Sequence, residues 1–386
     1  MKNFPLKVAK RLENRKENNA FRKLGKRKGE IDFSSNDYLG FAVSEEIWNS
    51  TSEIIKQHGL FHNGSSGSRL LTGNHELFSL TEEAIADFHM SEGALIYNSG
   101  FDANTGFFSG VPQRGDIIFF DEFSHASIRE GILLSHAKSI KFRHNDLADL
   151  ENKLRSPEAG TADVYVVTES VFSMDGDTPD LEKLAGICEK FGCFLVVDEA
   201  HATGIFGKNG RGLISAGNLE NRVFARIVTF GKALGAHGAA ILGSKKLMEY
   251  LINFSRSFIY TTALPPHSVA TILAAYQKLL ISDSFSELEK LQKNVLFFRR
   301  KIKELQLKKS FLESNSPIQS CIVAGNTNVK EIAAILQKNE YDVRPILAPT
   351  VPAGQERLRF CLHSYNYEEE IEAVLNVLAN FVKNKN

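Results

Sequence analysis

The fold is decided by the stretch FLVVDEAH at residues 194–201, in which four apolar residues lead directly into Asp198 and His201. A second stretch, ARIVTFGKALG at residues 225–235, repeats the arrangement and places Lys232 just after an apolar run. Short apolar runs of this kind are typical of strands buried on both faces of a parallel sheet. Because ligands bind beyond the carboxyl ends of such strands, we expect these polar side chains to converge on one cleft.

Apolar runs alternate with helical stretches from about residue 80 to residue 245. Residues 181–191, for example, place their apolar side chains at helical spacing. Alternation of strand and helix predicts an α/β fold with a mostly parallel, seven-stranded sheet covered on both faces. The predicted strands are residues 94–97, 116–120, 139–142, 164–168, 194–197, 226–230 and 239–243.

The last third of the chain has a different pattern. A long helical region is predicted over about residues 267–305, and a smaller α+β domain follows it. The elements predicted in the tail are strands at 318–323 and 357–362 and helices at 329–339 and 368–382. The predicted organisation is an N-terminal helical segment and arm at 1–45, a large α/β domain at 46–270, and a linking helix with a small C-terminal α+β domain at 271–386.

Length and charge restrict the classes of function. A chain of 386 residues is long enough for two or three domains and a large core. Its 46 basic residues balance 46 acidic ones, so no overall field favours nucleic acid or membrane as a partner. The four cysteines form no CxxC pair, and neither a membrane span nor a signal peptide is recognisable. We therefore expect a soluble, reduced, cytoplasmic protein.

The first thirty residues are locally basic. This composition is compatible with a nucleic-acid-binding arm or a transit peptide, but Glu13 and Glu17 interrupt the basic charge and transit peptides are poor in acidic residues. We expect instead a solvated helix that packs on the body of the protein through Leu6, Val8, Leu12 and Phe21.

Lys232 and Asp198 together suggest pyridoxal phosphate (PLP) chemistry. This cofactor needs a lysine for its Schiff base and a carboxylate that faces the nitrogen of its pyridine ring. Such a carboxylate keeps the nitrogen protonated, and its attraction is strongest in a cleft that holds little water. His201 could hold the phenolic oxygen of the ring or orient Asp198. A lone lysine after a strand is more often only solvated, and the Asp/His pair equally fits a structural hydrogen bond at a strand end.

A phosphate site is predicted at YNSGFDAN, residues 97–104, between a strand and a helix. A helix N-terminus binds phosphate through its free N–H groups, and Gly100 allows close approach. Thr229 could add a hydroxyl group. His125 follows another predicted strand and could stack on a cofactor ring. Taken singly, a Ser-Gly at such a junction is more often a capped turn than an anion site, and a histidine after a strand is more often an ordinary loop residue.

The four residues 198–201 also spell the DEAH box of nucleic-acid helicases. That function requires an upstream phosphate loop of the form GxxxxGK[ST], and the chain has none. The balanced net charge also disfavours it, so we set this alternative aside.

Seven ordered motifs together resemble the α-oxoamine synthase family. These enzymes use PLP and have fold type I, the aspartate-aminotransferase-like architecture. The resemblance covers about residues 22–363, and it implies an acyltransferase that condenses an amino acid with an acyl thioester and releases carbon dioxide. The motifs are SSNDYLG at 34–40, GSR at 67–69, SGF at 99–101, ESVFSMDG at 169–176, DEAH at 198–201, TFGK at 229–232 and YTTALPP at 260–266.

The resemblance implies roles for the residues around the cofactor ring. Lys232 would be the Schiff-base lysine and Asp198 the partner of the ring nitrogen. His201 and Ser173 would approach the ring oxygen, and His125 would stack on the ring. No metal is implied.

The resemblance also implies how the phosphate is held. Gly100, Phe101 and Thr229 would bind it from within one subunit, and Thr262 would reach the phosphate of a neighbouring subunit. The protein is therefore expected to be a homodimer with shared active sites.

For the substrates, the resemblance assigns the amino-acid carboxylate to Asn36 and Arg359, and the acyl substrate to Arg22 and Thr350. Some synthases of this type carry an arginine where Leu347 stands. The choice among L-alanine, glycine and L-serine, the acyl chain and its carrier (coenzyme A or a carrier protein) are therefore left open. The alternative from another class is a non-catalytic PLP-binding protein.

Overall fold

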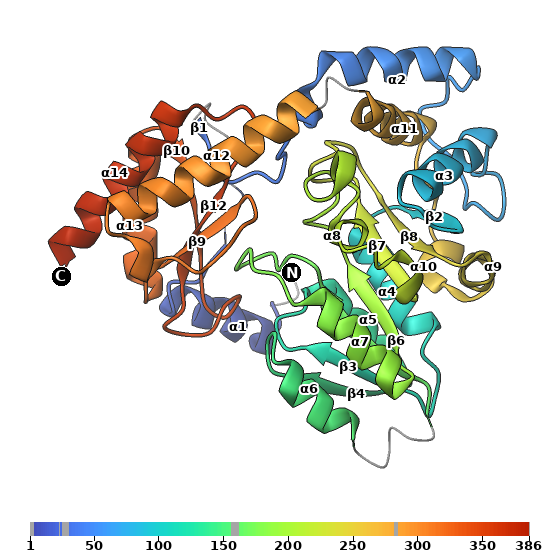
Figure 1. Ribbon diagram of the computed structural model, residues 1–386, viewed down its shortest axis with the longest axis horizontal. Helices are drawn as coiled ribbons and strands as arrows, with labels where there is room; N and C mark the ends of the chain where they lie inside the picture. Colours follow the sequence, from blue (N-terminus) through green and yellow to red (C-terminus); the bar gives the residue numbers. More distant parts are fainter. Residues whose placement is uncertain (1–3, 23, 25–30, 156–161, 282–284, 386) are drawn as a thin grey trace. The chain divides into compact units, whose positions relative to one another are not determined.

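The computed structural model of the chain (Figure 1) describes residues 4–22, 24, 31–155, 162–281 and 285–385. Contacts divide the chain into two compact units, and both are discontinuous in sequence. The larger unit contains residues 36–173 and 178–289, and the smaller contains residues 1–35, 174–177 and 290–386. Each unit has its own sheet.

The larger unit is built on a seven-stranded sheet with the order β2-β8-β7-β6-β5-β3-β4. Strand β8 is antiparallel to both of its neighbours, and every other pair is parallel. The predicted, mostly parallel sheet is therefore confirmed, and each predicted strand boundary lies within one residue of the observed one. The strands are β2 (Gly93–Tyr97), β3 (Ile117–Asp121), β4 (Lys138–Phe142), β5 (Val164–Glu169), β6 (Phe194–Asp198), β7 (Ala225–Thr229) and β8 (Ala239–Gly243).

Helices cover both faces of this sheet. Because successive strand residues point to opposite faces, Tyr165 and Val167 pack with helices α4, α5 and α9, whereas Val164 and Val166 pack with α6 and α7. This burial on both faces explains why the strands read as continuous apolar runs. The helices of the larger unit are α2 (Glu45–Gln57), α3 (Glu76–Phe88), α4 (Gly100–Gly110), α5 (Ala126–Leu134), α6 (Leu147–Leu154), α7 (Leu181–Phe191), α8 (Leu213–Ala216), α9 (Lys245–Phe254), α10 (Arg256–Ile259) and α11 (Pro266–Leu280).

Local sequence fixes where these helices begin and end. The side chain of Asp180 accepts a hydrogen bond from the N–H of Lys183 at the start of α7, and Gly192 ends that helix with a φ of 68°. At the start of α4, the Ser99 side chain accepts from the N–H of Asp102. The start of α4 therefore has a defined geometry, and it lies at a predicted phosphate site.

The smaller unit holds an antiparallel sheet with the order β11-β12-β9, and β1 pairs in parallel with β10. The aromatic rings of Phe298, Phe311 and Phe360 pack with centroids 5.6–6.2 Å apart in its core. The predicted tail strands and helices are present, and the three short strands β1, β10 and β11 are additional. The elements are α1 (Leu6–Glu17), β1 (Ile31–Asp32), most of α12 (Phe285–Glu304, whose first residues are counted with the larger unit), β9 (Ile318–Ile322), α13 (Asn326–Lys338), β10 (Tyr341–Asp342), β11 (Arg344–Ile346), β12 (Arg357–Cys361) and α14 (Glu368–Lys385).

Two expectations about helices need correction. The helical region predicted over residues 267–305 is two helices, α11 and α12, and residues 282–284 lie outside the described residues. Helix α1 forms as predicted, but none of its residues is buried, and Leu6, Val8, Leu12 and Phe21 are exposed to between 37% and 87%. In the described part of the chain, no helix is both long and apolar enough to cross a membrane.

Candidate active site

The candidate site lies at one edge of the seven-stranded sheet, where three neighbouring parallel strands end. In the strand register, Glu169 at the end of β5 pairs with Asp198 at the end of β6, and Asp198 pairs with Ile227 of β7. Lys232 follows β7 in the turn that leads to β8. The topology therefore brings Asp198 and the Lys232 turn to the same edge, as the two apolar runs predicted.

Asp198 is held by hydrogen bonds to both of its carboxylate oxygens. Its Oδ2 accepts from Asn104 Nδ2 at 2.8 Å, and its Oδ1 accepts from the N–H of Ala200 at 2.9 Å. Asp198 is only 5% exposed, so these bonds fix the direction of a carboxylate that is largely removed from water. Asn104 Oδ1 is buried beside it, with no hydrogen-bond partner among the described residues.

A short chain of hydrogen bonds connects Asn104 to His125. Asn104 Nδ2 donates to Ser127 Oγ at 3.0 Å, and Ser127 Oγ lies 2.8 Å from His125 Nδ1, which also accepts from the N–H of Ser127. A ring nitrogen that accepts two hydrogen bonds carries no proton, which assigns His125 as the neutral Nε2–H tautomer. The pKa of His125 is lowered, first by burial and then by the nearby Lys232, while Asp198 acts in the opposite direction.

His201 is held in place by a residue that lies far from it in the sequence. Its Nδ1 lies 2.8 Å from the hydroxyl of Tyr38, and this hydroxyl donates to Asn36 Oδ1 at 3.2 Å. Tyr38 is fully buried and His201 is nearly so. The contacts bring Asn36 close to His201 although the two residues lie far apart in the sequence.

Glu169 is a buried carboxyl group beside Asp198. Its Oε1 accepts from the backbone N–H of His125 at 2.6 Å, which ties the start of α5 to the end of β5. Burial is the main cause that raises the pKa of Glu169 to about 8, and the Asp198 carboxylate raises it further against the opposing effect of Lys232. At neutral pH, Glu169 is therefore mostly protonated.

The N-terminus of α4 offers an anion site at the same edge. The N–H groups of Asp102 and Ala103 bond to Ser99, whereas within the described part of the chain those of Gly100 and Phe101 have no hydrogen-bond partner. Thr229 borders this end, because a Cβ atom at Gly100 would lie 3.7 Å from Thr229 Oγ1. Free N–H groups at a helix start attract a phosphate.

The segment that carries Thr262 is tied to the strand that precedes this helix. Asn98 Nδ2 donates to the carbonyl oxygen of Thr262 at 2.7 Å and to Thr261 Oγ1 at 3.1 Å. The Thr262 side chain is exposed. Ser173 is half-buried and lies in the segment that follows β5.

The turn that carries Lys232 is fixed by backbone hydrogen bonds and by close packing. The N–H of Gly235 donates to the carbonyl of Lys232 at 2.9 Å, and the N–H of Ala236 donates to the carbonyl of Phe230 at 2.8 Å. Gly235 has a φ of 61°, and a Cβ atom there would lie only 2.1 Å from the backbone nitrogen of Ala42. Only glycine fits this position, because any side chain would clash with the backbone of Ala42 and the φ is positive.

The remaining predicted residues belong to the smaller unit. Arg22 Nη2 donates to Thr350 Oγ1 at 3.3 Å, which brings together the two residues expected to contact the acyl substrate. Arg359 lies on β12 and is 8% exposed. Its neighbour on the same face of the strand, Arg357, forms a buried ion pair with Asp175.

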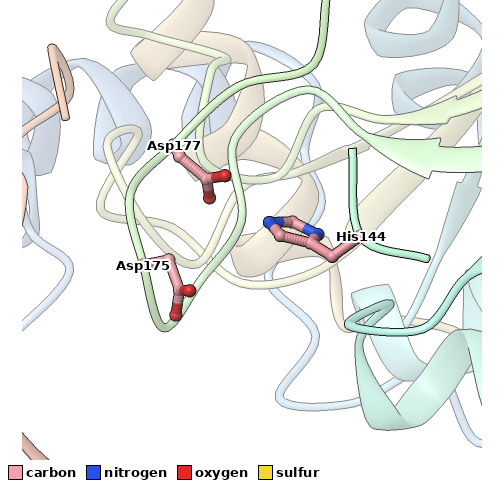
Figure 2. Close-up of side chains that lie close together, drawn as sticks. All are labelled: His144, Asp175 and Asp177. Atoms are coloured by element: carbon pink, nitrogen blue, oxygen red, sulfur yellow. The ribbon is translucent and has the colours of Figure 1, made fainter. Parts of the chain in front are cut away.

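Figure 2 shows that Asp175 and Asp177 lie in one loop, which belongs to the smaller unit. His144, the third residue labelled there, belongs to the larger unit. Within the larger unit, His144 Nδ1 lies 2.9 Å from Asp121 Oδ1, and its ring stacks on that of Phe123.

Four residues of the site were not assigned roles from the sequence: Tyr38, Asn104, Ser127 and Glu169. Asn104 could have been found, because it stands four residues after Gly100 and therefore on the same face of α4. Tyr38 and Glu169 lie inside motifs that were recognised, but their contacts depend on strand register and on packing between distant segments. No spacing in the sequence reveals such contacts.

The chain belongs to the aminotransferase class I and II family, which it matches over residues 28–378. Among curated proteins it is 41% identical to the 8-amino-7-oxononanoate synthase of Emericella nidulans, and the match covers 92% of this chain and 89% of that protein.

Two solved structures are also similar. The 8-amino-7-oxononanoate synthase of Francisella tularensis is 31% identical, with a TM-score of 0.76 over 92% of this chain and 98% of that chain. A serine palmitoyltransferase variant from S. paucimobilis, solved with a bound PLP–myriocin aldimine, is 26% identical, with a TM-score of 0.87 over 98% of this chain and 97% of that chain.

Proposed function

We propose that this protein is a PLP-dependent acyltransferase that condenses L-alanine with a pimeloyl thioester to give 8-amino-7-oxononanoate and carbon dioxide, a step of biotin biosynthesis. The observation that carries the proposal is the meeting of Asp198, the Lys232 turn and the open start of α4 at one sheet edge. The chain is also 41% identical to a protein named 8-amino-7-oxononanoate synthase.

The residues at this edge fit PLP. Asp198, fixed by Asn104 and Ala200, would hold the proton of the ring nitrogen, and the free N–H groups of Gly100 and Phe101 would hold the phosphate. When bound, the cofactor supplies a ring that accepts electrons from the α-carbon of the amino acid. His201, Ser173 and His125 would line the ring, and Thr229 would add a hydroxyl to the phosphate site.

Side chains of the protein would then transfer the protons and bind the carboxylate of the amino acid. The amine of Lys232 removes the α-proton of the amino acid and later returns a proton to the product. Between these steps, a carbon–carbon bond forms from the α-carbon to the thioester carbonyl, the thiol departs, and the original carboxylate leaves as carbon dioxide. Asn36 and Arg359 are the proposed clamp for that carboxylate, because an arginine fork binds it through two hydrogen bonds.

The proposal includes a homodimer in the cytoplasm. Thr262 is exposed and anchored through its carbonyl oxygen to Asn98 beside the phosphate site, which supports a role for its hydroxyl toward a second subunit. All four cysteines are free thiols, as expected in a reducing compartment.

The test is product formation by purified, PLP-loaded protein. L-alanine, glycine and L-serine would each be combined with pimeloyl-, acetyl- and palmitoyl-CoA and with a pimeloyl carrier protein, and products identified by mass spectrometry. Formation of 8-amino-7-oxononanoate from L-alanine and a pimeloyl thioester alone is the expected result. Preference for glycine with acetyl-CoA, or for serine with palmitoyl-CoA, would reassign the protein to a sister activity. Failure to exchange the α-proton of any amino acid would indicate a non-catalytic PLP-binding protein.

A further inference from the structure

His363 is a fully buried histidine of the smaller unit, two residues after the end of β12. Its ring stacks on that of Tyr365, with centroids 4.6 Å apart. Its Nε2 lies 3.1 Å from both the carbonyl oxygen and the Oγ of Ser35, and its Nδ1 lies 3.1 Å from Asn366 Oδ1. A carbonyl oxygen can only accept a hydrogen bond, so Nε2 carries a proton.

The orientation of the Asn366 amide is fixed by its other contacts. Its Oδ1 accepts from the backbone N–H of His363 at 2.9 Å, and its Nδ2 donates to the carbonyl oxygen of Asp32 at 3.1 Å. A flipped amide would bring two donors together at His363 and two acceptors together at Asp32. The atom that faces His363 Nδ1 is therefore an acceptor. Both ring nitrogens then carry a proton, and His363 is an imidazolium.

Asp32 supplies the opposite charge. Its Oδ1 accepts from the N–H groups of Ser34 and Ser35, each at 2.9 Å, and its Oδ2 accepts from the hydroxyl of Tyr365 at 3.2 Å. Burial, the largest single effect, would raise the pKa of Asp32, but the backbone bond from Ser35 and the charge of His363 hold this pKa at about 2. Asp32 is therefore ionised at neutral pH, and a buried carboxylate favours a positive neighbour.

These contacts join residues 31–35 to the end of β12. The N–H of Cys361, the last residue of β12, donates to the carbonyl oxygen of Phe33 at 2.8 Å. Two residues further along each stretch, His363 contacts Ser35. The two stretches are thus fixed to each other at successive points within the smaller unit.

The stretches that His363 joins lead to the two residues of the proposed carboxylate clamp. Asn36 directly follows Ser35, and Arg359 stands on β12, four residues before His363. We propose that His363, as an imidazolium, is a positioning residue for this clamp: it holds the backbone beside Asn36 to the strand that carries Arg359. This inference rests on the proposed function and specifies which buried charge prepares the protein for the carboxylate of its amino-acid substrate.

The first experiment measures the binding of L-alanine to PLP-loaded protein from the change in its visible absorption spectrum. His363→Phe keeps a flat ring for stacking on Tyr365 but loses every ring hydrogen bond, whereas His363→Gln keeps a donor for Ser35. We expect the Kd for L-alanine to rise at least about 10-fold in His363→Phe and less in His363→Gln, because a small displacement of a clamp weakens it strongly. An unchanged Kd in both variants would overturn the proposal.

Gln319→Ala is the control for a general loss of stability in the smaller unit. Gln319 is 1% exposed, and its Nε2 donates to the carbonyl oxygens of Ser314 and Ser316. Its replacement therefore also removes buried hydrogen bonds, but not those that hold residues 31–35. The Kd for L-alanine should stay unchanged in this variant. A rise equal to that of His363→Phe would show that any destabilisation of the unit has the same effect, which contradicts a specific role for His363.

A ligand without a carboxylate tests whether the effect of His363 acts through the clamp. L-alaninamide has the amine and the methyl group of L-alanine but no negative charge, so the difference between His363→Phe and the unaltered protein should disappear with it. An equal loss of binding for both ligands would refute the positioning role. Binding precedes condensation, so this titration does not depend on the thioester, and it can use glycine or L-serine if the protein prefers either.

The charge of His363 can be measured without cofactor or turnover. In protein labelled with nitrogen-15 histidine, the ring signals that disappear in His363→Gln belong to His363, and at neutral pH they should show two protonated nitrogens. A neutral ring would contradict the inferred imidazolium, whatever reaction the protein catalyses. Failure of the condensation with intact imidazolium signals and carboxylate-dependent binding would instead leave this inference standing and reject the proposed function.

Discussion

The amide nitrogen of Asn104 donates to Asp198 Oδ2 at 2.8 Å and to Ser127 Oγ at 3.0 Å. One side chain on α4 thus orients the carboxylate at the end of β6 and, through Ser127, the ring of His125. The position of α4 is itself fixed by its apolar residues Ala103 and Phe107, which are buried against the sheet. The geometry of the candidate site is therefore set by the packing of this helix.

Replacing Asn104 by alanine removes a buried donor from Asp198. The expected cost is about 1–3 kcal/mol in the free energy of unfolding, because the carboxylate loses a charge-assisted bond without gaining water. Asn253→Ala is the matched control: its amide bonds to the Glu249 carbonyl on the exposed side of α9, and it should cost less than about 0.5 kcal/mol. Urea denaturation measures the stability difference, and PLP titration should show weaker cofactor binding only for the Asn104 variant. Equal behaviour of both variants would remove Asn104 from the site.

Lys232 is predicted to be the residue that links the cofactor. Borohydride reduction of PLP-loaded protein, followed by peptide mapping, should place the label on Lys232 alone. Lys232→Ala should abolish condensation, whereas the exposed Lys208→Ala on the same unit should retain activity. A label on another lysine, or substantial turnover by Lys232→Ala, would refute the assignment.

The raised pKa of Glu169 predicts that the free energy of unfolding depends on pH. Its pKa of about 8 in the folded chain lies above the ordinary value of 4.5, so the folded protein holds a proton that the unfolded chain has released between these values. This contribution to stability is complete below about pH 4.5 and is lost as pH rises toward 8, with a slope of at most about 1.4 kcal/mol per pH unit. Glu169→Gln should remove the slope, because glutamine stays neutral and its Oε1 still accepts from His125.

The measurement for Glu169 is urea denaturation of the cofactor-free protein between pH 5 and pH 8.5, using Glu83→Gln on the exposed surface of α3 as the control. The stability of Glu169→Gln relative to the unaltered protein should increase with pH, and that of Glu83→Gln should not. Parallel pH profiles for all three proteins would contradict a buried, protonated Glu169.

The sequence predicts the sheet well because its strands are buried on both faces. Continuous apolar runs such as residues 194–197 have few alternatives to a buried parallel strand, and the polar residue that ends each run marks the functional edge. The short strands β1 and β10 have two residues each, so they leave no periodic signal, and they are defined by pairing between distant segments. For the same reason, the place of residues 174–177 in the smaller unit could not be predicted, since it depends on contacts such as Arg357–Asp175.

Glu199, the residue after Asp198, forms a buried ion pair with Arg226. Arg226 Nε donates to Glu199 Oε2 at 2.9 Å, and the N–H of Ile214 donates to Glu199 Oε1 at 3.0 Å. Gly212 passes this carboxylate with a φ of 101°, and a Cβ atom there would lie 2.7 Å from both of its oxygens. Gly212→Ala must therefore strain the backbone and displace a fully buried charge from its partner.

We expect Gly212→Ala to lower the free energy of unfolding by about 3 kcal/mol or more, the scale for disrupting a buried ion pair. Gly186→Ala is the matched control, because Gly186 lies inside α7 and only the end of the Arg222 side chain comes within 4 Å of its added Cβ. Alanine is the better helix former, so this change should be neutral or stabilise the fold by up to about 1 kcal/mol. Thermal and urea unfolding of the two variants compare the same chemical change in two environments. A Gly212→Ala protein as stable as Gly186→Ala would show that the turn after the DEAH segment tolerates a side chain and that Glu199 does not depend on its present position.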